Sequence, residues 1–127
     1  MKINHVSVFT NDLERLKKYY ITYFGATANN RYHNPKTGLQ TYFLTFADGA
    51  RLEIMTKPEL ADNCSPQPHI GWAHLAFSAG SKEQVDILTK RIVDDGFALF
   101  SAPRVTGDGY YESCVSDPDG NQIEIVE

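Results

Sequence analysis

Residues 117–125 read Asp-Pro-Asp-Gly-Asn-Gln-Ile-Glu-Ile, a turn that leads directly into a strand. Pro, Gly, Asp and Asn are the residues that tight turns favour, and the alternating apolar residues that follow indicate a half-buried strand. The pattern occurs earlier too, where residues 48–54 read Asp-Gly-Ala-Arg-Leu-Glu-Ile. The chain therefore carries two copies of one turn-and-strand motif, each with a Glu between two apolar residues.

Each copy of this motif is preceded, further upstream, by one member of a second pair of matching segments. Residues 5–9 read His-Val-Ser-Val-Phe and residues 74–78 read His-Leu-Ala-Phe-Ser. Between these matching segments, the hydrophobic periodicity predicts the same order of helix and strands in both halves. The first half is predicted to contain a strand at 2–9, a helix at 12–24 and strands at 27–33, 39–47 and 50–56. The second half is predicted to contain a strand at 72–78, a helix from Ser81 to Gly96 and strands at 97–104, 109–116 and 121–126.

The repeat defines the fold class that we expect, an α+β protein made of two paired βαβββ modules. Module one covers 1–56 and module two covers 71–127, within a single domain of 1–127. A Pro-rich linker at 57–70 joins them. Because one such module is too small to bury both faces of its sheet, we expect the two to form one curved mixed sheet with the helices on its convex face.

Turn and capping residues set the expected ends of the elements. Asn11 is predicted to cap the first helix with Glu14 as its reciprocal partner, and Ser81 to cap the second with Gln84. Gly25 is predicted to end the first helix. Asp48-Gly49 is typical of a two-residue hairpin turn.

Strand alternation places four polar side chains on the side of the sheet away from the helices. Successive strand residues face opposite sides of the sheet. The apolar residues of these strands face the helices, so the polar residues between them point into the hollow of the sheet. These four polar residues are His5, Glu53, His74 and Glu124. Each half supplies one His from its first strand and one Glu from its last.

Two imidazoles and two carboxylates in one place favour a metal site. Carboxylates at close range repel each other unless a cation or a shared proton intervenes. Mixed nitrogen and oxygen ligands suit Zn²⁺, Ni²⁺, Co²⁺, Mn²⁺ or Fe²⁺ better than Ca²⁺ or Cu⁺. Four protein ligands would leave positions open for water or substrate oxygens, which is typical of a catalytic site.

The sequence resembles the glyoxalase, bleomycin-resistance and extradiol-dioxygenase superfamily, also called the vicinal oxygen chelate superfamily. The resemblance covers essentially the whole chain and is most specific in residues 117–125. It implies paired βαβββ modules and metal ligands at His5, Glu53, His74 and Glu124. The ligand set is most similar to that of glyoxalase I (lactoylglutathione lyase), because Glu53 supplies the fourth acid.

The resemblance also implies a reaction. A glyoxalase I-like lyase isomerises the hemithioacetal of methylglyoxal and a thiol to a lactoyl thioester, with one divalent metal per site. His at the first ligand position in a short chain resembles the nickel- or cobalt-preferring type more than the zinc type. Glu124 would be the main catalytic base and Glu53 its partner. The resemblance further implies a homodimer that acts on a small-molecule substrate.

Two other readings stay open. One is another metal-dependent member of the superfamily, an epimerase or an antibiotic thiol transferase; the other is a metal-free, drug-binding resistance protein. Glu53 favours the lyase over the former, and the full ligand set favours it over the latter. Phe9 stands where glutathione-using members commonly carry Arg, and Lys57 where they often carry Asn.

Four aromatic residues are further candidates for contacts with the substrate: Phe9, Tyr42, Trp72 and Tyr110. His33 and His69 lie in turn-rich segments, and we expect them at the surface.

Composition narrows the possible partners of the protein, the state of its cysteines and its location. The 127 residues carry a net charge of −4 and no basic stripe, which argues against a nucleic-acid partner. The two cysteines, Cys64 and Cys114, lack a Cys-x-x-Cys spacing and are expected to be free thiols. No signal peptide and no membrane-spanning apolar run is evident, so we expect a soluble cytoplasmic protein without a membrane partner.

Overall fold

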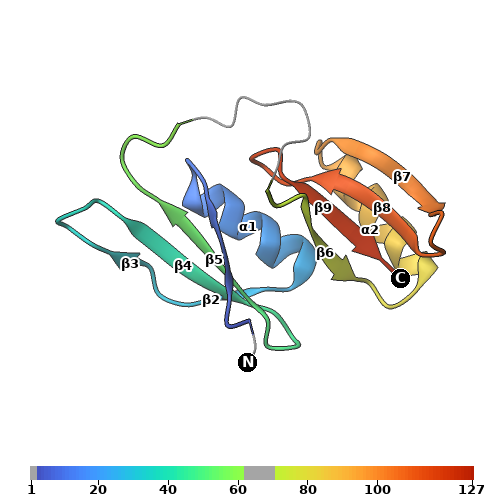
Figure 1. Ribbon diagram of the computed structural model, residues 1–127, viewed down its shortest axis with the longest axis horizontal. Helices are drawn as coiled ribbons and strands as arrows, with labels where there is room; N and C mark the ends of the chain where they lie inside the picture. The colour runs from blue at the N-terminus through green and yellow to red at the C-terminus, as the bar shows by residue number, and fades with distance from the viewer. Residues whose placement is uncertain (1–2, 62–70) are drawn as a thin grey trace. The chain divides into compact units, whose positions relative to one another are not determined.

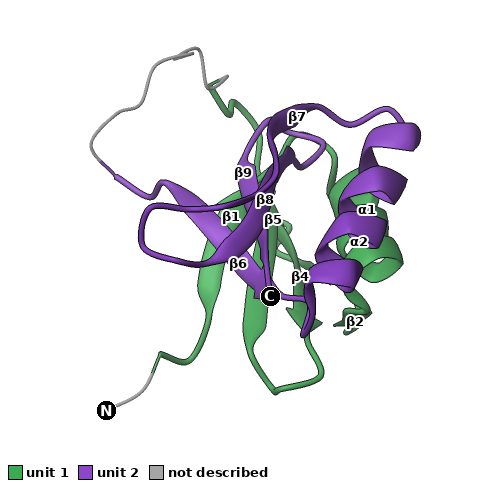
Figure 2. Ribbon diagram, turned by 90° about the vertical axis from the view of Figure 1, so that its right-hand side faces the viewer, with its two compact units in different colours: residues 1–64 green, residues 65–127 purple. Residues whose placement is uncertain are grey.

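The computed structural model describes residues 3–61 and 71–127, which fall into two compact units (Figure 2). Unit 1 is Met1–Cys64 and unit 2 is Ser65–Glu127. Most of the predicted linker, residues 62–70, lies outside the described residues, and so do His69 and Cys64. The predicted module boundaries remain a prediction.

Unit 1 consists of one helix packed on one mixed sheet (Figure 1). Its elements are β1 (Val6–Phe9), α1 (Leu13–Phe24), β2 (Thr27–Ala28), β3 (Tyr32–His33), β4 (Gln40–Thr45) and β5 (Arg51–Thr56). The strand order is β1-β5-β4-β2, with β3 also paired to β4. β1 and β5 are parallel, and the other pairs are antiparallel.

Unit 2 repeats this topology. Its elements are β6 (His74–Ser78), α2 (Lys82–Asp94), β7 (Leu99–Val105), β8 (Tyr111–Ser116) and β9 (Gln122–Val126). The strand order is β6-β9-β8-β7, and β6 and β9 form the parallel pair. The predicted fold class, two α+β modules with mixed sheets, is confirmed. Each unit has its own hydrogen-bonded sheet.

One strand prediction was wrong. Residues 27–33 form two short strands, β2 and β3, because Asn29 interrupts the pairing with β4. The Asn29 side-chain oxygen accepts a hydrogen bond from the Phe43 backbone N–H (2.7 Å), while its backbone N–H donates to the Phe43 carbonyl (3.1 Å). A side-chain acceptor thus replaces the carbonyl that a continuous strand would supply.

The predicted helix-capping residues are found in the structure, except that the N-cap of the first helix lies one residue later. Ser81 caps α2 by accepting a hydrogen bond from the backbone N–H of Gln84, and Gly25 ends α1 with φ 64°, both as predicted. The cap of α1 is Asp12 rather than Asn11, because its carboxylate accepts from the Arg15 backbone N–H (2.9 Å). Glu14 is therefore no capping partner; it pairs with Lys17 and accepts from the Tyr42 hydroxyl (2.7 Å).

The predicted two-residue turn at Asp48-Gly49 is longer in the structure. The backbone N–H of Phe46 donates to the Ala50 carbonyl (3.0 Å), and that of Gly49 donates to the Phe46 carbonyl (2.9 Å). Gly49 has φ 87°, so the turn ends in a left-handed residue. The turns at 106–110 and 117–121 have the same two hydrogen bonds and a left-handed glycine.

The turn at 117–121 is also held by a buried carboxylate. Asp117 accepts hydrogen bonds from the backbone N–H groups of Asp119 and Asn121 (2.9 Å each) and from the Asn121 side-chain amide (2.8 Å). Burial raises the pKa of this carboxyl, while the hydrogen bonds oppose the shift. The motif that reveals the repeat is therefore fixed by its own first residue.

The core of each unit lies between its helix and one face of its sheet. In unit 1, Leu52 and Ile54 are buried on the helix side, as strand alternation predicts. In unit 2, Ile123 and Ile125 occupy the matching positions on β9 and are fully buried. The strand residues between them face the opposite side of each sheet, which we call the open face. Neither helix in the described part of the chain is long and apolar enough to cross a membrane.

A buried hydroxyl pair joins α2 to its sheet. The Thr89 hydroxyl lies 2.6 Å from the Ser113 hydroxyl and also donates to the Val85 carbonyl (2.6 Å). Both side chains are buried, and the Thr89 hydroxyl supplies the Ser113 hydroxyl with a hydrogen-bond partner inside the core.

Thr89→Val is therefore expected to lower the free energy of unfolding of unit 2 by about 1–3 kcal/mol, because it leaves the Ser113 hydroxyl buried with one partner fewer. The double variant Thr89→Val/Ser113→Ala is expected to recover much of this loss, since it removes both polar groups. Urea denaturation of the two single variants and the double variant measures the coupling. Strictly additive losses would contradict the pairing.

Candidate metal centre

The open face of unit 1 carries the first His–Glu pair. Glu53 lies on β5 with Ser7 of β1 and Phe43 of β4 as its strand neighbours. His5 directly precedes β1, and its Nε2 is 3.6 Å from Glu53 Oε2. The Ser7 hydroxyl donates a hydrogen bond to the same carboxylate oxygen (3.1 Å). The parallel pairing of β1 with β5 thus brings the two predicted ligands together.

Three further side chains surround His5. Its Nδ1 is 2.9 Å from Asn4 Oδ1, which also accepts a hydrogen bond from Arg51 Nη2. The Phe43 ring meets the imidazole edge-on, with 5.2 Å between ring centroids. The Arg51 guanidinium lies over the Phe43 ring, 4.7 Å from its centroid. These contacts fix the orientation of the His5 ring.

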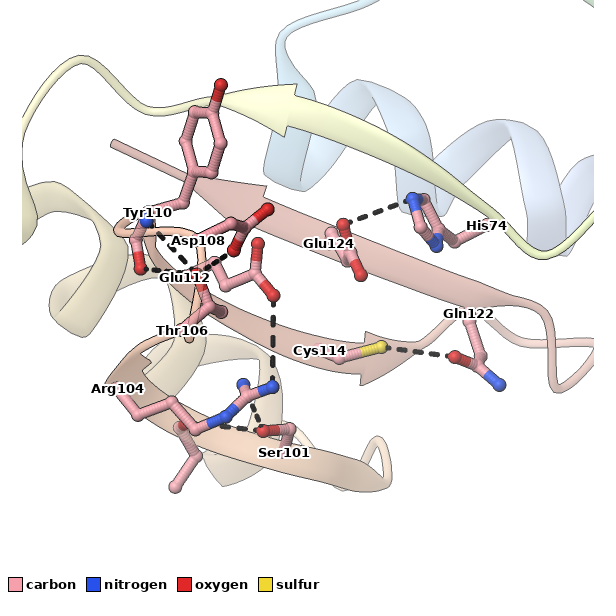
Figure 3. Close-up of polar contacts among 11 residues, drawn as sticks. His74, Ser101, Arg104, Thr106, Asp108, Tyr110, Glu112, Cys114, Gln122 and Glu124 are labelled. Atoms are coloured by element: carbon pink, nitrogen blue, oxygen red, sulfur yellow. Dashed lines mark hydrogen bonds and ion pairs between the residues drawn. The ribbon is translucent and has the colours of Figure 1, made fainter.

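The open face of unit 2 carries the second pair (Figure 3). His74 opens β6, and its Nε2 is 3.1 Å from Glu124 Oε2 on β9. The strand neighbours of Glu124 are Ala76 and Cys114, which match Ser7 and Phe43 of unit 1. Each His and Glu side chain of the two pairs is partly exposed, so a small molecule can reach it.

Cys114 does not add a thiolate to this face. Its side chain is buried and its Sγ lies 3.7 Å from Gln122 Oε1. Burial, together with the negative charges of Glu124 and Glu112, raises the pKa of the thiol from 9.0 to about 11. The thiol is therefore protonated at neutral pH and a poor metal ligand.

The donor atoms fit a divalent metal. Nitrogen and carboxylate ligands lie about 2.0–2.2 Å from Zn²⁺, so two ligands at 90–109° are about 2.8–3.6 Å apart. The 3.6 Å in unit 1 and the 3.1 Å in unit 2 both fall within this range. Each pair offers one nitrogen and one oxygen, the mixed set that first-row transition metals accept.

The structure brings together two of the predicted ligands in each unit. Within residues 3–61 and 71–127, no group of three or more His, Cys, Asp or Glu side chains is gathered as for a metal ion. The two pairs belong to different units, and each is described on its own. Convergence of all four residues on one ion stays a prediction.

The candidate aromatic residues differ in position. Phe9 ends β1 and is half exposed, with Lys57 Nζ 5.4 Å from its ring centroid. Trp72 is 87% exposed just before His74, and Tyr110 is exposed in the turn between β7 and β8. Tyr42 is buried on the helix side of β4, where Lys17 lies 4.2 Å from its ring centroid. It packs against α1, on the face opposite Glu53.

Other positions follow from the same geometry. His33 is exposed on β3, as expected for a surface residue. Strand alternation correctly places Ser7 on the face of His5, and the structure shows it beside Glu53. Sequence reasoning missed Asn4 and Arg51 as neighbours of the first pair, although parity could have indicated Arg51, which lies two residues before Glu53.

The comparisons identify the class of protein. Residues 2–125 match the model of the Glyoxalase/Bleomycin resistance protein/Dioxygenase superfamily, and the chain belongs to this superfamily. It is similar to the uncharacterized protein YqjT of Bacillus subtilis (strain 168), with 26% identity over 131 residues covering 98% of this chain and 97% of the relative.

Two solved structures show the same fold. A glyoxalase family protein from Enterococcus faecalis superposes with a TM-score of 0.82 at 24% identity, covering 99% of this chain and 97% of the other. A glyoxalase I mutant from Zea mays superposes with a TM-score of 0.80 at 22% identity, covering 98% of this chain and 44% of the other. At these identities the likeness establishes the fold.

The state of Cys114 gives a test of the open face of unit 2. In a Cys64→Ser variant, where Cys114 is the remaining thiol, alkylation by iodoacetamide should rise with pH along a curve centred at about 11. The ordinary value is 9.0, so below both values the thiolate fraction and the rate should be about 100-fold lower than for an unperturbed thiol. A small model thiol is the control, and a midpoint near 9 would contradict the burial argument.

Proposed function

We propose that this protein is a metal-dependent lyase of the glyoxalase I kind. One observation carries the proposal: in both units a His at the start of the first strand or directly before it lies next to a Glu of the last strand on the open face. A fold that needed only a core would have no reason to keep this pair twice. Membership of the superfamily supports the proposal, because the resemblance of the sequence implies metal ligands at these four positions.

His5, Glu53, His74 and Glu124 would hold one divalent ion, with Ni²⁺ or Co²⁺ favoured and Zn²⁺ as the alternative. The two imidazoles would bind as neutral ligands and the two carboxylates as anions. When bound, the metal would act as a Lewis acid on the oxygens of the substrate. The remaining chemistry falls to the carboxylates.

The reaction moves one proton between neighbouring carbons. Glu124 would take the proton from the carbon that carries the thiol and deliver it to the adjacent carbonyl carbon. The hydroxyl hydrogen of the hemithioacetal would pass to the neighbouring oxygen, so that a hydroxy thioester forms without gain or loss of atoms. Glu53 would act as its partner. The surroundings support this division, because Ser7 donates a hydrogen bond to Glu53, whereas the matching neighbour of Glu124 is Ala76, which has no hydroxyl.

A second candidate is another metal-dependent member of the superfamily with a different substrate. Phe9 and Lys57 favour it, since an exposed ring with a nearby ammonium group stands at the positions where glutathione-using members commonly carry Arg and Asn. The His–Glu pairs would have the same ligand role in either enzyme. A substrate panel with methylglyoxal and several thiols distinguishes the two candidates.

The first prediction of this proposal concerns the metal. Calorimetric titration of metal-stripped protein should show one Ni²⁺ or Co²⁺ bound per chain, and light scattering of the same sample should give the mass of a homodimer. At a free metal concentration of 100 times Kd, the free energy of unfolding should rise by about 2.7 kcal/mol.

Loss of a ligand should weaken this binding. His5→Gln and His74→Gln should each lower the affinity by more than the roughly 10–100-fold that loss of a supporting residue costs. His33→Gln removes an exposed imidazole on β3 and serves as the control. Absence of saturable binding for Ni²⁺, Co²⁺ and Zn²⁺ would overturn the enzyme proposal in favour of a metal-free, drug-binding protein.

The second prediction concerns the base. Glu124→Gln should lower kcat by about 10²–10⁴-fold with the substrate that the panel identifies, because an amide cannot take the proton. Glu112→Gln is the matched control: it lies on the same open face, partly buried and 3.9 Å from Arg104. Metal content is measured for both variants, so that loss of the ion is separated from loss of the base. Equal activity in the two variants would exclude Glu124 as the base.

A further inference from the structure

The contacts of Asn4 determine which of its atoms faces His5. Arg51 Nη2 donates to Asn4 Oδ1, and a guanidinium group can only donate hydrogen bonds. The Asn4 atom at this position must therefore be the carbonyl oxygen rather than the amide nitrogen. Arg51 thus fixes the rotation of the Asn4 amide.

The same oxygen determines the tautomer of His5. It lies 2.9 Å from His5 Nδ1, a distance that requires a hydrogen between the two atoms. Because the oxygen can only accept, the hydrogen must belong to Nδ1. A neutral imidazole carries one N–H, so Nε2 keeps its lone pair.

This lone pair faces an acceptor. Nε2 is 3.6 Å from Glu53 Oε2, and that oxygen already accepts a hydrogen bond from Ser7. Two acceptors that face each other repel unless a cation, a proton or a bridging donor lies between them. The arrangement therefore suits an ion that takes one electron pair from nitrogen and one from oxygen.

We propose that Asn4 and Arg51 are positioning residues that hold His5 in the tautomer with hydrogen on Nδ1, so that Nε2 is ready to bind the metal. The metal-binding part of this inference rests on the proposed function; the tautomer does not. Arg51 is itself held, because its guanidinium lies over the Phe43 ring that meets His5 edge-on.

Unit 2 has no counterpart of Asn4 and Arg51, so its His–Glu pair can be compared with that of unit 1. The residue before His74 is Ala73, and the residue two positions before Glu124 is Gln122, so neither Asn4 nor Arg51 has a counterpart. The distance from His74 Nε2 to Glu124 Oε2 is 3.1 Å, which is a hydrogen-bond length. His74 can therefore carry its hydrogen on Nε2 in the absence of metal, in contrast to His5.

The tautomers are read from long-range ¹H–¹⁵N correlation spectra of metal-stripped, histidine-labelled protein at pH 8.5, about two units above the ordinary pKa of His. His5→Gln assigns the signal of His5. We expect His5 to show hydrogen on Nδ1 in the unaltered protein. Asn4→Ala should move it toward the tautomer with hydrogen on Nε2, and Asn4→Asp, which keeps the acceptor oxygen, should restore it.

Metal affinity is the second readout. Asn4→Ala should weaken Ni²⁺ binding by roughly 10–100-fold, as expected for loss of a group that orients a ligand. Arg51→Gln, which installs the residue found in unit 2, should shift the tautomer in the same direction and covers the case in which Asn4→Ala fails to fold. Asn30→Ala, an exposed Asn of the same unit, is the matched control and should change neither readout.

The outcomes separate the two proposals. A His5 with hydrogen on Nε2 in the unaltered protein, or a tautomer that neither Asn4→Ala nor Arg51→Gln changes, would overturn the role of these residues. The expected tautomers without saturable metal binding would support the positioning of His5 and overturn the proposed function instead.

Discussion

The parallel pairing of the first strand with the last strand is the constraint on which each unit depends. It joins β1 to β5 and β6 to β9, although the paired strands lie at opposite ends of their unit in sequence. A parallel connection needs a crossover, and the helix that follows the first strand of each unit begins it. Because that helix covers one face of the sheet, the side chains of the central strands divide into a buried set and an open set. The His–Glu pairs follow directly from this division.

The same constraint explains why polar residues are tolerated in the middle of each sheet. Glu53 and Glu124 each lie between two buried apolar residues of the same strand, yet their own side chains face away from the helix. A carboxylate on the helix side would have to be desolvated without compensation. On the open face it keeps access to water, to an imidazole and to a cation. Because the fold is duplicated, each unit has a position on its open face where a carboxylate can stay charged and solvated.

The two units are not chemically equivalent. Ser7 and Phe43 flank Glu53, whereas Ala76 and Cys114 flank Glu124. The Ser7 hydroxyl and the Phe43 ring therefore restrain the first pair, while the strand neighbours of Glu124 provide neither a hydroxyl nor a ring. A restrained carboxylate suits a ligand that stays in place, and a less restrained one suits a group that must accept and release a proton. The asymmetry gives a physical reason for assigning different roles to two residues that the repeat makes formally identical.

The sequence could predict the fold to the extent that periodicity and turn chemistry determine it. The parity of β5 and β9 placed Glu53 and Glu124 on the open face, because each lies between two apolar residues. β4 lacks such a pattern: Thr41 and Tyr42 are both buried, so alternation could not tell that Phe43, and not Tyr42, shares the face of Glu53.

The contacts around His5 were beyond the sequence for a different reason. They depend on side-chain rotamers and on the register between strands, neither of which leaves a periodic signal. Asn4 precedes β1 and Arg51 begins β5, so they come together near the His5 ring only once β1 pairs with β5. An Asn before a His is unremarkable until an arginine from another strand fixes its amide. The protonation pattern of a candidate ligand is thus a property of the pairing between β1 and β5, and the topology that builds the pair also decides which nitrogen it presents.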